Sequence, residues 1–218
     1  MATSGTKTFK LDVSDLIEEA YERCGLEMRS GYDARTARRS LNILMSDWSN
    51  RGINLWTIDK TTTTLTESDN TETLSASIVD ITDMSLQRDS TDYTMERLSR
   101  SEYHALPKKS TEGRPTQYFL DRQATPILYL YPTPENSTDK IIYYATTRVE
   151  DANALTNDVD IPARFIASLV SGLSYQLSIK KAPERAQALK AIYEEEMQRA
   201  EFEDREKVSL RLVPARSR

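Results

Sequence analysis

Apolar residues recur at steps of three and four at both ends of the chain and alternate with polar residues in between. A step of three or four places apolar side chains on one face of an α-helix, whereas strict alternation places them on one face of a β-strand. The sequence therefore predicts helices at its two ends and strands in its middle.

Two amphipathic helices are predicted before residue 55. In LDVSDLIEEAYERCGL the apolar face comprises Val13, Leu16, Ile17, Ala20, Tyr21 and Cys24. In DARTARRSLNILMSDWSNRG it comprises Ala34, Ala37, Leu41, Leu44, Met45 and Trp48. Asp12 or Ser14 is expected to cap the first helix and Asp33 the second, with Gly25 and Gly52 at their ends. Because the connection between them is short, we expect an antiparallel hairpin.

Strands are predicted from Leu55 to Arg148, where short segments rich in Thr, Tyr, Ile and Val are separated by polar turns. These segments are LWTIDKTTTTLT, TLSASIVDITDM, DYTMERLS, PTQYFLDRQ, PILYLYPTP and DKIIYYATTR. They indicate an antiparallel sheet or a small sandwich, with Thr61–Thr64 in an exposed or edge strand. The segment SRSEYHALP predicts one short helix that Pro107 ends.

Two further helices follow Pro162. The face of the first comprises Ile166, Leu169, Leu173 and Leu177, broadened by Phe165, Val170 and Ile179. The second is expected from about Pro183 to Lys207 and is densely charged on its other faces. Its inward residues are expected to be Ala186, Leu189, Ile192 or Tyr193, Met197 and Ala200.

The order of elements predicts an α+β protein. A two-helix hairpin has too small a core to bury its own apolar face, so we expect a four-helix bundle formed by the N- and C-terminal helix pairs, with an inserted antiparallel β domain. The expected parts are an N-terminal helical pair (1–54), the β domain (55–150), a C-terminal helical pair (151–207) and an extended C-terminal arm (208–218).

Composition narrows the class of protein. The chain has 218 residues and a net charge of −5, so it is large enough for one or two domains and is not uniformly basic as many nucleic-acid-binding proteins are. Cys24 is the only cysteine, which excludes an intrachain disulfide, fits a reducing compartment and indicates a small buried apolar residue. We see no secretion signal at the N-terminus and no membrane-spanning apolar run, so we expect a soluble protein made in a cytoplasm.

The residues offer little catalytic chemistry. A single histidine, His104, excludes Ser-His-Asp and Cys-His arrangements and zinc sites with two imidazoles. No glycine-rich phosphate loop is present. The 34 acidic residues leave a carboxylate-pair hydrolase open, but no spacing selects a pair. We therefore predict no catalytic residue, metal site or cofactor.

Three arginines cluster on the polar side of the second helix. Arg35, Arg38 and Arg39 can contact phosphates, but salt bridges to an acidic helix suit the net charge better. The strand aromatics fit a base-stacking platform as well as cross-strand packing. A nucleic-acid-binding module therefore stays an alternative.

The C-terminal arm changes both period and charge. Val208, Leu210 and Leu212 alternate with polar residues, and from residue 205 onward five basic residues stand against one acidic residue. Such a segment either folds back onto its own domain or docks, extended, on another chain. A frayed terminus is the alternative.

Three segments together resemble a known family. They are LSRSEYHALPKKSTEGRPTQYFLDRQATPILYLYPTP, DVDIPARFIASLVSGLSYQLSIKKAPER and YEEEMQRAEFEDREKVSLRLVPARSR. With the order of elements from about Leu11 onward, they resemble the head-to-tail adaptor proteins of short-tailed double-stranded DNA bacteriophages, also called portal adaptors or tail tubular protein A-like proteins.

The resemblance implies a virion protein at the portal vertex, made in the cytoplasm of a bacterial host. Such adaptors form a ring, usually of twelve copies, beneath the portal protein. They extend the channel through which the genomic DNA passes, without sequence-specific binding, and carry the tail nozzle and tail fibres. Without its portal the protein is expected to be a monomer or weak oligomer.

The resemblance assigns the portal-binding residues, and opposite charges on two helix faces suggest the contacts between subunits as a hypothesis. Portal binding falls on the C-terminal arm, at Val208, Ser209, Leu210, Arg211, Leu212, Val213, Pro214, Arg216 and Arg218. Contacts between neighbouring subunits are expected to pair Arg35, Arg38 and Arg39 with Glu194, Glu195 and Glu196. The alternative functions are a cell-wall-degrading tail component with a carboxylate pair, and the nucleic-acid-binding module.

Overall fold

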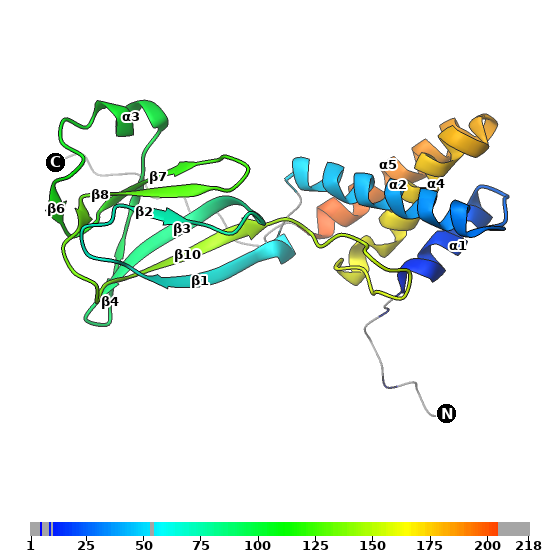
Figure 1. Cartoon of the computed structure of the whole chain (residues 1–218). Coiled ribbons are helices and arrows are strands. Elements are labelled where there is room, and N and C mark those ends of the chain that lie inside the picture. Colours follow the sequence, from blue (N-terminus) through cyan, green and yellow to red (C-terminus); the bar gives the residue numbers. More distant parts are fainter. Residues whose placement is uncertain (1–4, 6–8, 10, 53–54, 205–218) are drawn as a thin grey trace, which may run out of the picture. The chain divides into compact units, whose positions relative to one another are not determined.

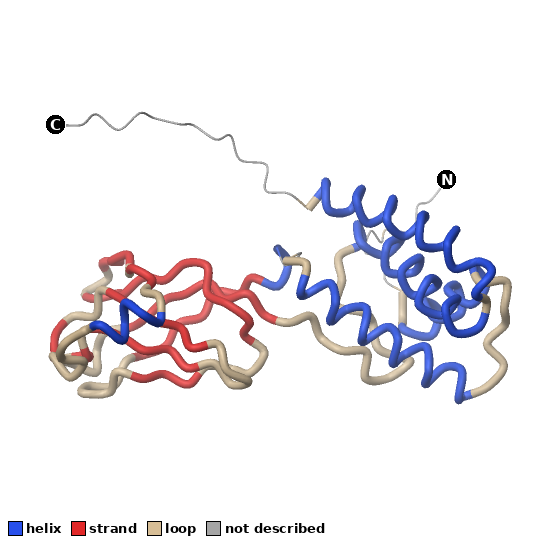
Figure 2. The backbone as a smooth tube through the Cα atoms, turned by 90° about the horizontal axis from the view of Figure 1, so that it is seen from above, coloured by secondary structure: helices blue, strands red, loops and turns tan. Residues whose placement is uncertain are grey.

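The computed structural model describes residues 5, 9, 11–52 and 55–204 of the chain. They fall into two compact units, one from the residues before Asn54 and those from Glu150 onward, and the other from Asn54–Val149. Strands are confined to the second unit, and the long helices to the first (Figure 2). The predicted α+β class is confirmed.

The described part of the helical unit contains four α-helices (Figure 1). They are α1 (Val13–Arg23), α2 (Gly31–Asn50), α4 (Ile166–Lys181) and α5 (Ala186–Glu203). Short 3₁₀ turns, Ala163–Phe165 and Pro183–Arg185, lead into α4 and α5. The last helix is therefore shorter than expected, because Pro183 begins a 3₁₀ turn and α5 ends at Glu203.

Side-chain caps fix the starts of the first two helices. The Asp12 carboxylate accepts a hydrogen bond of 2.8 Å from the Asp15 amide, as predicted. Asp33 is not the cap of α2: the Ser30 hydroxyl accepts from the Asp33 amide, and the Asp33 carboxylate accepts from the Ser30 hydroxyl at 2.9 Å. The helix begins two residues before Asp33 because Gly31 and Tyr32 already form its first turn.

Helix α4 packs against α1, α2 and α5, so the predicted contact between helices from the two ends of the chain is confirmed. Its apolar residues Leu169, Leu173 and Leu177 are completely buried. Four serines of α4 are buried as well: Ser168, Ser171, Ser174 and Ser178. The hydroxyls of the last three donate to carbonyl oxygens of α4 itself, at 2.7–3.2 Å. These hydroxyls can therefore be buried without a hydrogen-bond partner on another helix.

Two expectations for the helix faces are decided by this packing. Ile179 does not extend the buried face of α4, since it lies near the end of the helix and is 52% exposed. Of the alternatives on α5, Tyr193 is buried and Ile192 is exposed. The Trp48 indole N–H on α2 donates a 2.9 Å hydrogen bond to the Tyr193 hydroxyl, which explains why the tyrosine faces inward.

The β unit is built from two four-stranded sheets with the orders β1-β10-β3-β4 and β2-β8-β7-β5, and a small pair, β6-β9 (Figure 1). The strands of the first sheet are β1 (Ile58–Thr64), β10 (Lys140–Thr147), β3 (Ile78–Arg88) and β4 (Thr91–Thr94). Those of the second are β2 (Thr71–Thr73), β8 (Ile127–Tyr131), β7 (Gln117–Asp121) and β5 (Glu96–Arg97). The small pair is β6 (Glu112–Gly113) and β9 (Thr133–Pro134).

Both four-stranded sheets contribute to one apolar cluster, which includes Ile81, Leu86 and Ile141 from the first sheet and Leu128 and Leu130 from the second. The unit is therefore a small sandwich, as predicted. The expectation of purely antiparallel strands was wrong, because the short pairs β5-β7 and β6-β9 are parallel.

Two local predictions in the β unit are confirmed. The threonine run lies in β1, at an edge of its sheet, where the strand pairs with β10 alone. The short helix α3 (Arg100–Ala105) follows Ser99, whose hydroxyl accepts from the Glu102 amide while the Glu102 carboxylate accepts from the Ser99 amide. This reciprocal pair of bonds is a capping box, which stabilises a helix too short to persist alone.

Gly172 provides a test of the packing around α4. A Cβ atom at this position would lie 2.8 Å from Leu44 Cδ2 and 2.9 Å from Tyr193 Cε2. We expect Gly172→Ala to lower the free energy of unfolding of the helical unit by about 1–3 kcal/mol, because the added methyl overpacks a filled core. Urea denaturation followed by circular dichroism at the helix band measures this change.

Gly31→Ala is the matched control. A Cβ atom at Gly31, in the first turn of α2, would meet no atom within 4 Å. This substitution is expected to leave stability unchanged or to raise it slightly through helix propensity. Equal changes in the free energy of unfolding for the two substitutions would contradict the close packing of α2, α4 and α5 at Gly172.

Candidate functional site

The arginines predicted to lie between subunits are on the surface of α2. Arg35 and Arg39 are exposed, and Arg38 is half-buried. The Arg38 guanidinium donates to the Asn153 carbonyl oxygen, and Arg35 Nε donates to the Gly31 carbonyl oxygen at 3.3 Å. None of the three forms an ion pair with a described residue, so their charges are open to a partner.

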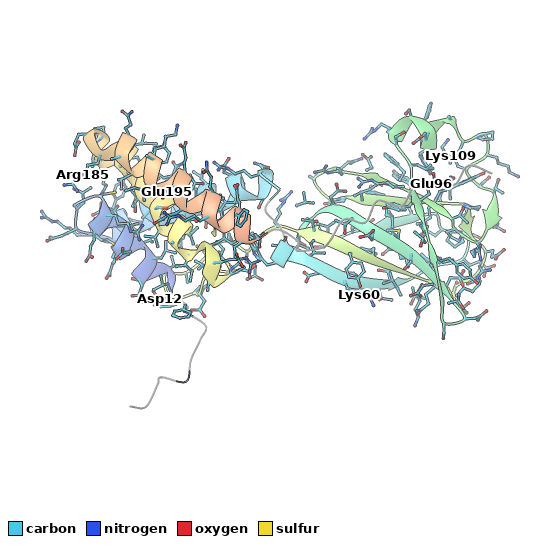
Figure 3. All side chains as sticks on the ribbon, turned by 180° about the vertical axis from the view of Figure 1, so that it is seen from behind. Asp12, Lys60, Glu96, Lys109, Arg185 and Glu195 are labelled. Atoms are coloured by element: carbon cyan, nitrogen blue, oxygen red, sulfur yellow. The ribbon has the colours of Figure 1, made fainter. Side chains whose placement is uncertain are left out.

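The glutamates predicted to receive those arginines already have partners in their own chain. Glu194 lies 3.5 Å from Lys190, and Glu195, which is labelled in Figure 3, pairs with Arg199 one turn later on α5. Glu196 lies 3.7 Å from Arg23 of α1. The pairs of Glu194 and Glu195 are exposed and contribute little to stability, so they can exchange for contacts in an assembly, whereas the pair of Glu196 with Arg23 is half-buried.

The predicted portal-binding residues Val208–Arg218 lie outside the described residues. The last described residue, Asp204, is 8% exposed and accepts a 2.7 Å hydrogen bond from Arg164 Nε. This charged hydrogen bond attaches the start of the C-terminal segment to the chain just before α4.

A groove runs along α1 and the beginning of α4, with a volume of about 850 Å³. Its lining is Phe9, Leu11, Asp15, Glu18, Glu19, Glu22, Arg23, Ala163, Ile166, Ala167 and Val170. The α1 wall is acidic and the α4 wall is apolar. Arg23 is the one basic residue of the lining, and its Nε lies 3.0 Å from Glu19.

Sequence reasoning missed this groove, although it carried a signal. Asp15, Glu18, Glu19 and Glu22 recur at steps of three and four within α1, which places them on one helix face. The apolar wall of the groove could not be predicted from the sequence, because it forms only where α4 packs beside α1.

Cys24 is buried in the helical unit, and its thiol donates to the Ser174 carbonyl oxygen at 3.2 Å. Burial raises the pKa of the thiol, and the nearby Arg185 guanidinium lowers it by less. The sequence interpretation of Cys24 as a small buried residue is thus confirmed. His104 is exposed on α3, and no group of three potential metal ligands occurs among the described residues.

The β unit presents an aromatic cluster beneath α3. The ring of Tyr103 lies 5.4 Å from that of Phe119 and 5.3 Å from that of Tyr129, and the Arg100 guanidinium lies over Phe119. The Lys109 ammonium, labelled in Figure 3, lies over the Tyr103 ring at 5.4 Å from its centroid. Stacked rings with cations above them form a firm, partly exposed surface without reactive groups.

The described residues thus present charged side chains on α2, a groove beside α1 and an aromatic cluster beside α3. Comparison with known protein families gives a match to the SU10 adaptor protein over residues 11–218. The chain belongs to the SU10 adaptor protein family. It is accordingly a phage head-to-tail adaptor, a structural rather than a catalytic protein of the virion.

The match to this adaptor family begins at Leu11, so it includes both helix pairs, the β unit and the C-terminal arm. A search of curated proteins gives no match to the adaptor. Within its described residues, no helix is both long and apolar enough to cross a bilayer.

The buried thiol of the adaptor makes a simple prediction about reactivity. We expect iodoacetamide at neutral pH to leave Cys24 unmodified in the folded protein, because burial both blocks access and disfavours the thiolate. Mass spectrometry measures the modification. Protein unfolded in guanidinium chloride is the control and should be alkylated; rapid alkylation of the folded protein would contradict the burial.

Proposed function

We propose that this adaptor forms a ring, of twelve copies, that joins the portal protein to the tail, extends the DNA channel and carries the tail nozzle and fibres. The family match over residues 11–218 is the observation that carries the proposal, because it covers nearly the whole chain. In this proposal α1, α2, α4 and α5 act as a four-helix bundle that builds the ring wall.

The C-terminal arm is proposed to bind the portal. Val208, Leu210 and Leu212 supply apolar side chains at a period of two, and Arg211 and Arg216 supply charge. An extended segment of this kind suits a crevice with apolar pockets and an acidic rim. Asp204, the residue just before this segment, forms an ion pair with Arg164. This ion pair supports the proposed role, because it fixes the point at which the segment leaves the helical unit.

The open charges of α2 are proposed to contact Glu194, Glu195 and Glu196 of the neighbouring subunit. Arg35 and Arg39 are free to do so, whereas Glu194 and Glu195 would exchange weak, exposed pairs of their own chain for the new ones. Glu196 would exchange its half-buried pair with Arg23. A ring closes only if each contact fixes the same rotation, and opposed charges help to set that register.

The β unit is proposed as the platform for tail proteins, and the net charge as an aid to DNA passage. Stacked aromatic rings under cations give a surface whose side chains lose little freedom on docking. A protein with a net charge of −5 releases few counterions from DNA, so the DNA gains little binding energy as it passes.

Substitutions in the arm test portal binding. We expect Leu210→Ser with Leu212→Ser to weaken binding to the portal by about ten- to hundredfold for each leucine, because each buried leucine contributes about 1.5–3 kcal/mol. Co-sedimentation with purified portal, followed by electron microscopy of the complex, measures this. Ser209→Ala is the matched control on the opposite side of the arm; undiminished binding of the leucine variant would overturn the proposal.

Charge reversal on α2 tests the contact between subunits. Arg35→Glu with Arg39→Glu should leave the folded monomer intact but prevent the ring from closing on the portal, since it places like charges opposite the three glutamates. Particle images of the mixture report ring formation. Arg29→Glu reverses an exposed charge outside α2 as the control. Complete rings from the double variant would refute the pairing.

A further inference from the structure

The groove between α1 and α4 has the chemistry of a binding site for a basic, apolar segment. Glu18 and Glu22 on its acidic wall form no ion pair with any described residue. On the other wall Ile166 is half-buried and Ala167 is exposed, so apolar surface faces the groove. Phe9, also in the lining, is 76% exposed. A groove that joins open apolar surface to carboxylates without a described ion-pair partner can bind a segment that is both apolar and basic.

The chain itself contains a segment with the complementary chemistry. Residues 205–218 have five basic residues and one acidic residue, and three apolar side chains at a period of two. Apolar side chains of an extended segment all point to one side and can cover the α4 wall. The long side chains of Lys207 and Arg211 can then reach the carboxylates of α1, since arginine and lysine extend their charges well beyond the backbone.

The segment also begins in the right place. Asp204 binds Arg164, and the residue next to Arg164 is Ala163, which lines the groove. Leu210 is six residues beyond Asp204, a reach of roughly 20 Å in an extended chain. The apolar wall from Ala163 to Val170 spans seven residue steps, or about 10 Å of helix. The arm therefore reaches the groove of its own subunit.

We propose that in the free protein the C-terminal arm lies in the groove between α1 and α4 of its own chain, with Val208, Leu210 and Leu212 on the α4 wall. Attachment within one chain gives the arm an effective concentration in the millimolar range, which favours its own groove over that of a second copy. Release of the arm by the portal is a second step, and that step rests on the proposed function.

Disulfide trapping in the full chain tests the resting position. We expect Ala167→Cys with Leu210→Cys to give an intrachain disulfide as the main product of mild oxidation, identified by peptide mass spectrometry. Native Cys24 does not interfere, because it is buried. Gln198→Cys with Leu210→Cys is the matched control: Gln198 is exposed on α5, six residues before Asp204, and is as easily reached by an undocked arm.

Each outcome of the trapping experiment decides the proposal. A yield several times higher for the Ala167 pair than for the Gln198 pair supports it. Equal yields, or a higher yield for Gln198, overturn it. Disulfide-linked dimers of the Ala167 pair also overturn it, because the groove then holds the arm of a second copy.

Charge reversal tests the chemistry of the same site. Glu18→Lys with Glu22→Lys is expected to reduce the yield of the Ala167 pair to that of the Gln198 pair, without changing the latter, and circular dichroism verifies that the variant is folded. An unchanged yield overturns the role of the acidic wall and with it the proposal.

Adding purified portal separates this inference from the proposed function. Portal is expected to lower the yield of the Ala167 pair. If the disulfide forms in free protein but portal does not lower its yield or bind the arm, the proposed function fails and the resting position stands. If no disulfide forms and the arm still binds the portal, the resting position fails and the proposed function stands.

Discussion

The burial of α4 is the constraint on which the helical unit depends. Its apolar and serine-lined surface is covered by α1 and α2 from the start of the chain and by α5 from its end. The hydrogen bond from Trp48 to Tyr193 joins residues 145 positions apart. The helices from the two ends of the chain share one core, so the β unit is an insertion whose two ends both connect to the same helical unit.

The sequence predicted the helices and strands that short patterns of apolar residues indicate. It did not predict features that form only when distant segments of the chain pack together. The apolar stripes of α1 and α2 were readable because one side of each helix is exposed. Helix α4 was read less well, since buried serines such as Ser171 look polar in sequence but bond to their own backbone. The parallel strand pairs form between segments that are not adjacent in sequence, and so does the groove beside α1. A short sequence pattern therefore predicts neither feature.

Helices α1 and α5 both carry acidic residues, but the surroundings of these residues differ. On α5, Glu194 and Glu195 are neutralised by basic residues one turn away, as in many solvated helices. On α1, Glu18 and Glu22 have no such partner and border apolar surface. A sequence shows both helices as acidic, but the carboxylates of α1 are better suited to bind a segment that is both basic and apolar. Glu18 and Glu22 form no ion pair with a described residue and lie beside an apolar wall.

An arm that rests in its own groove lowers its affinity for any other acceptor. If the docked form predominates by a given factor, the apparent affinity of one subunit for the portal falls by the same factor. A ring reverses this disadvantage, because every additional subunit binds next to those already attached and the contacts multiply. Under the proposed function, the same arm would bind the portal weakly in a single subunit and firmly in a complete ring. Weak binding by one copy and strong binding by many would thus follow from one acidic groove and one basic segment.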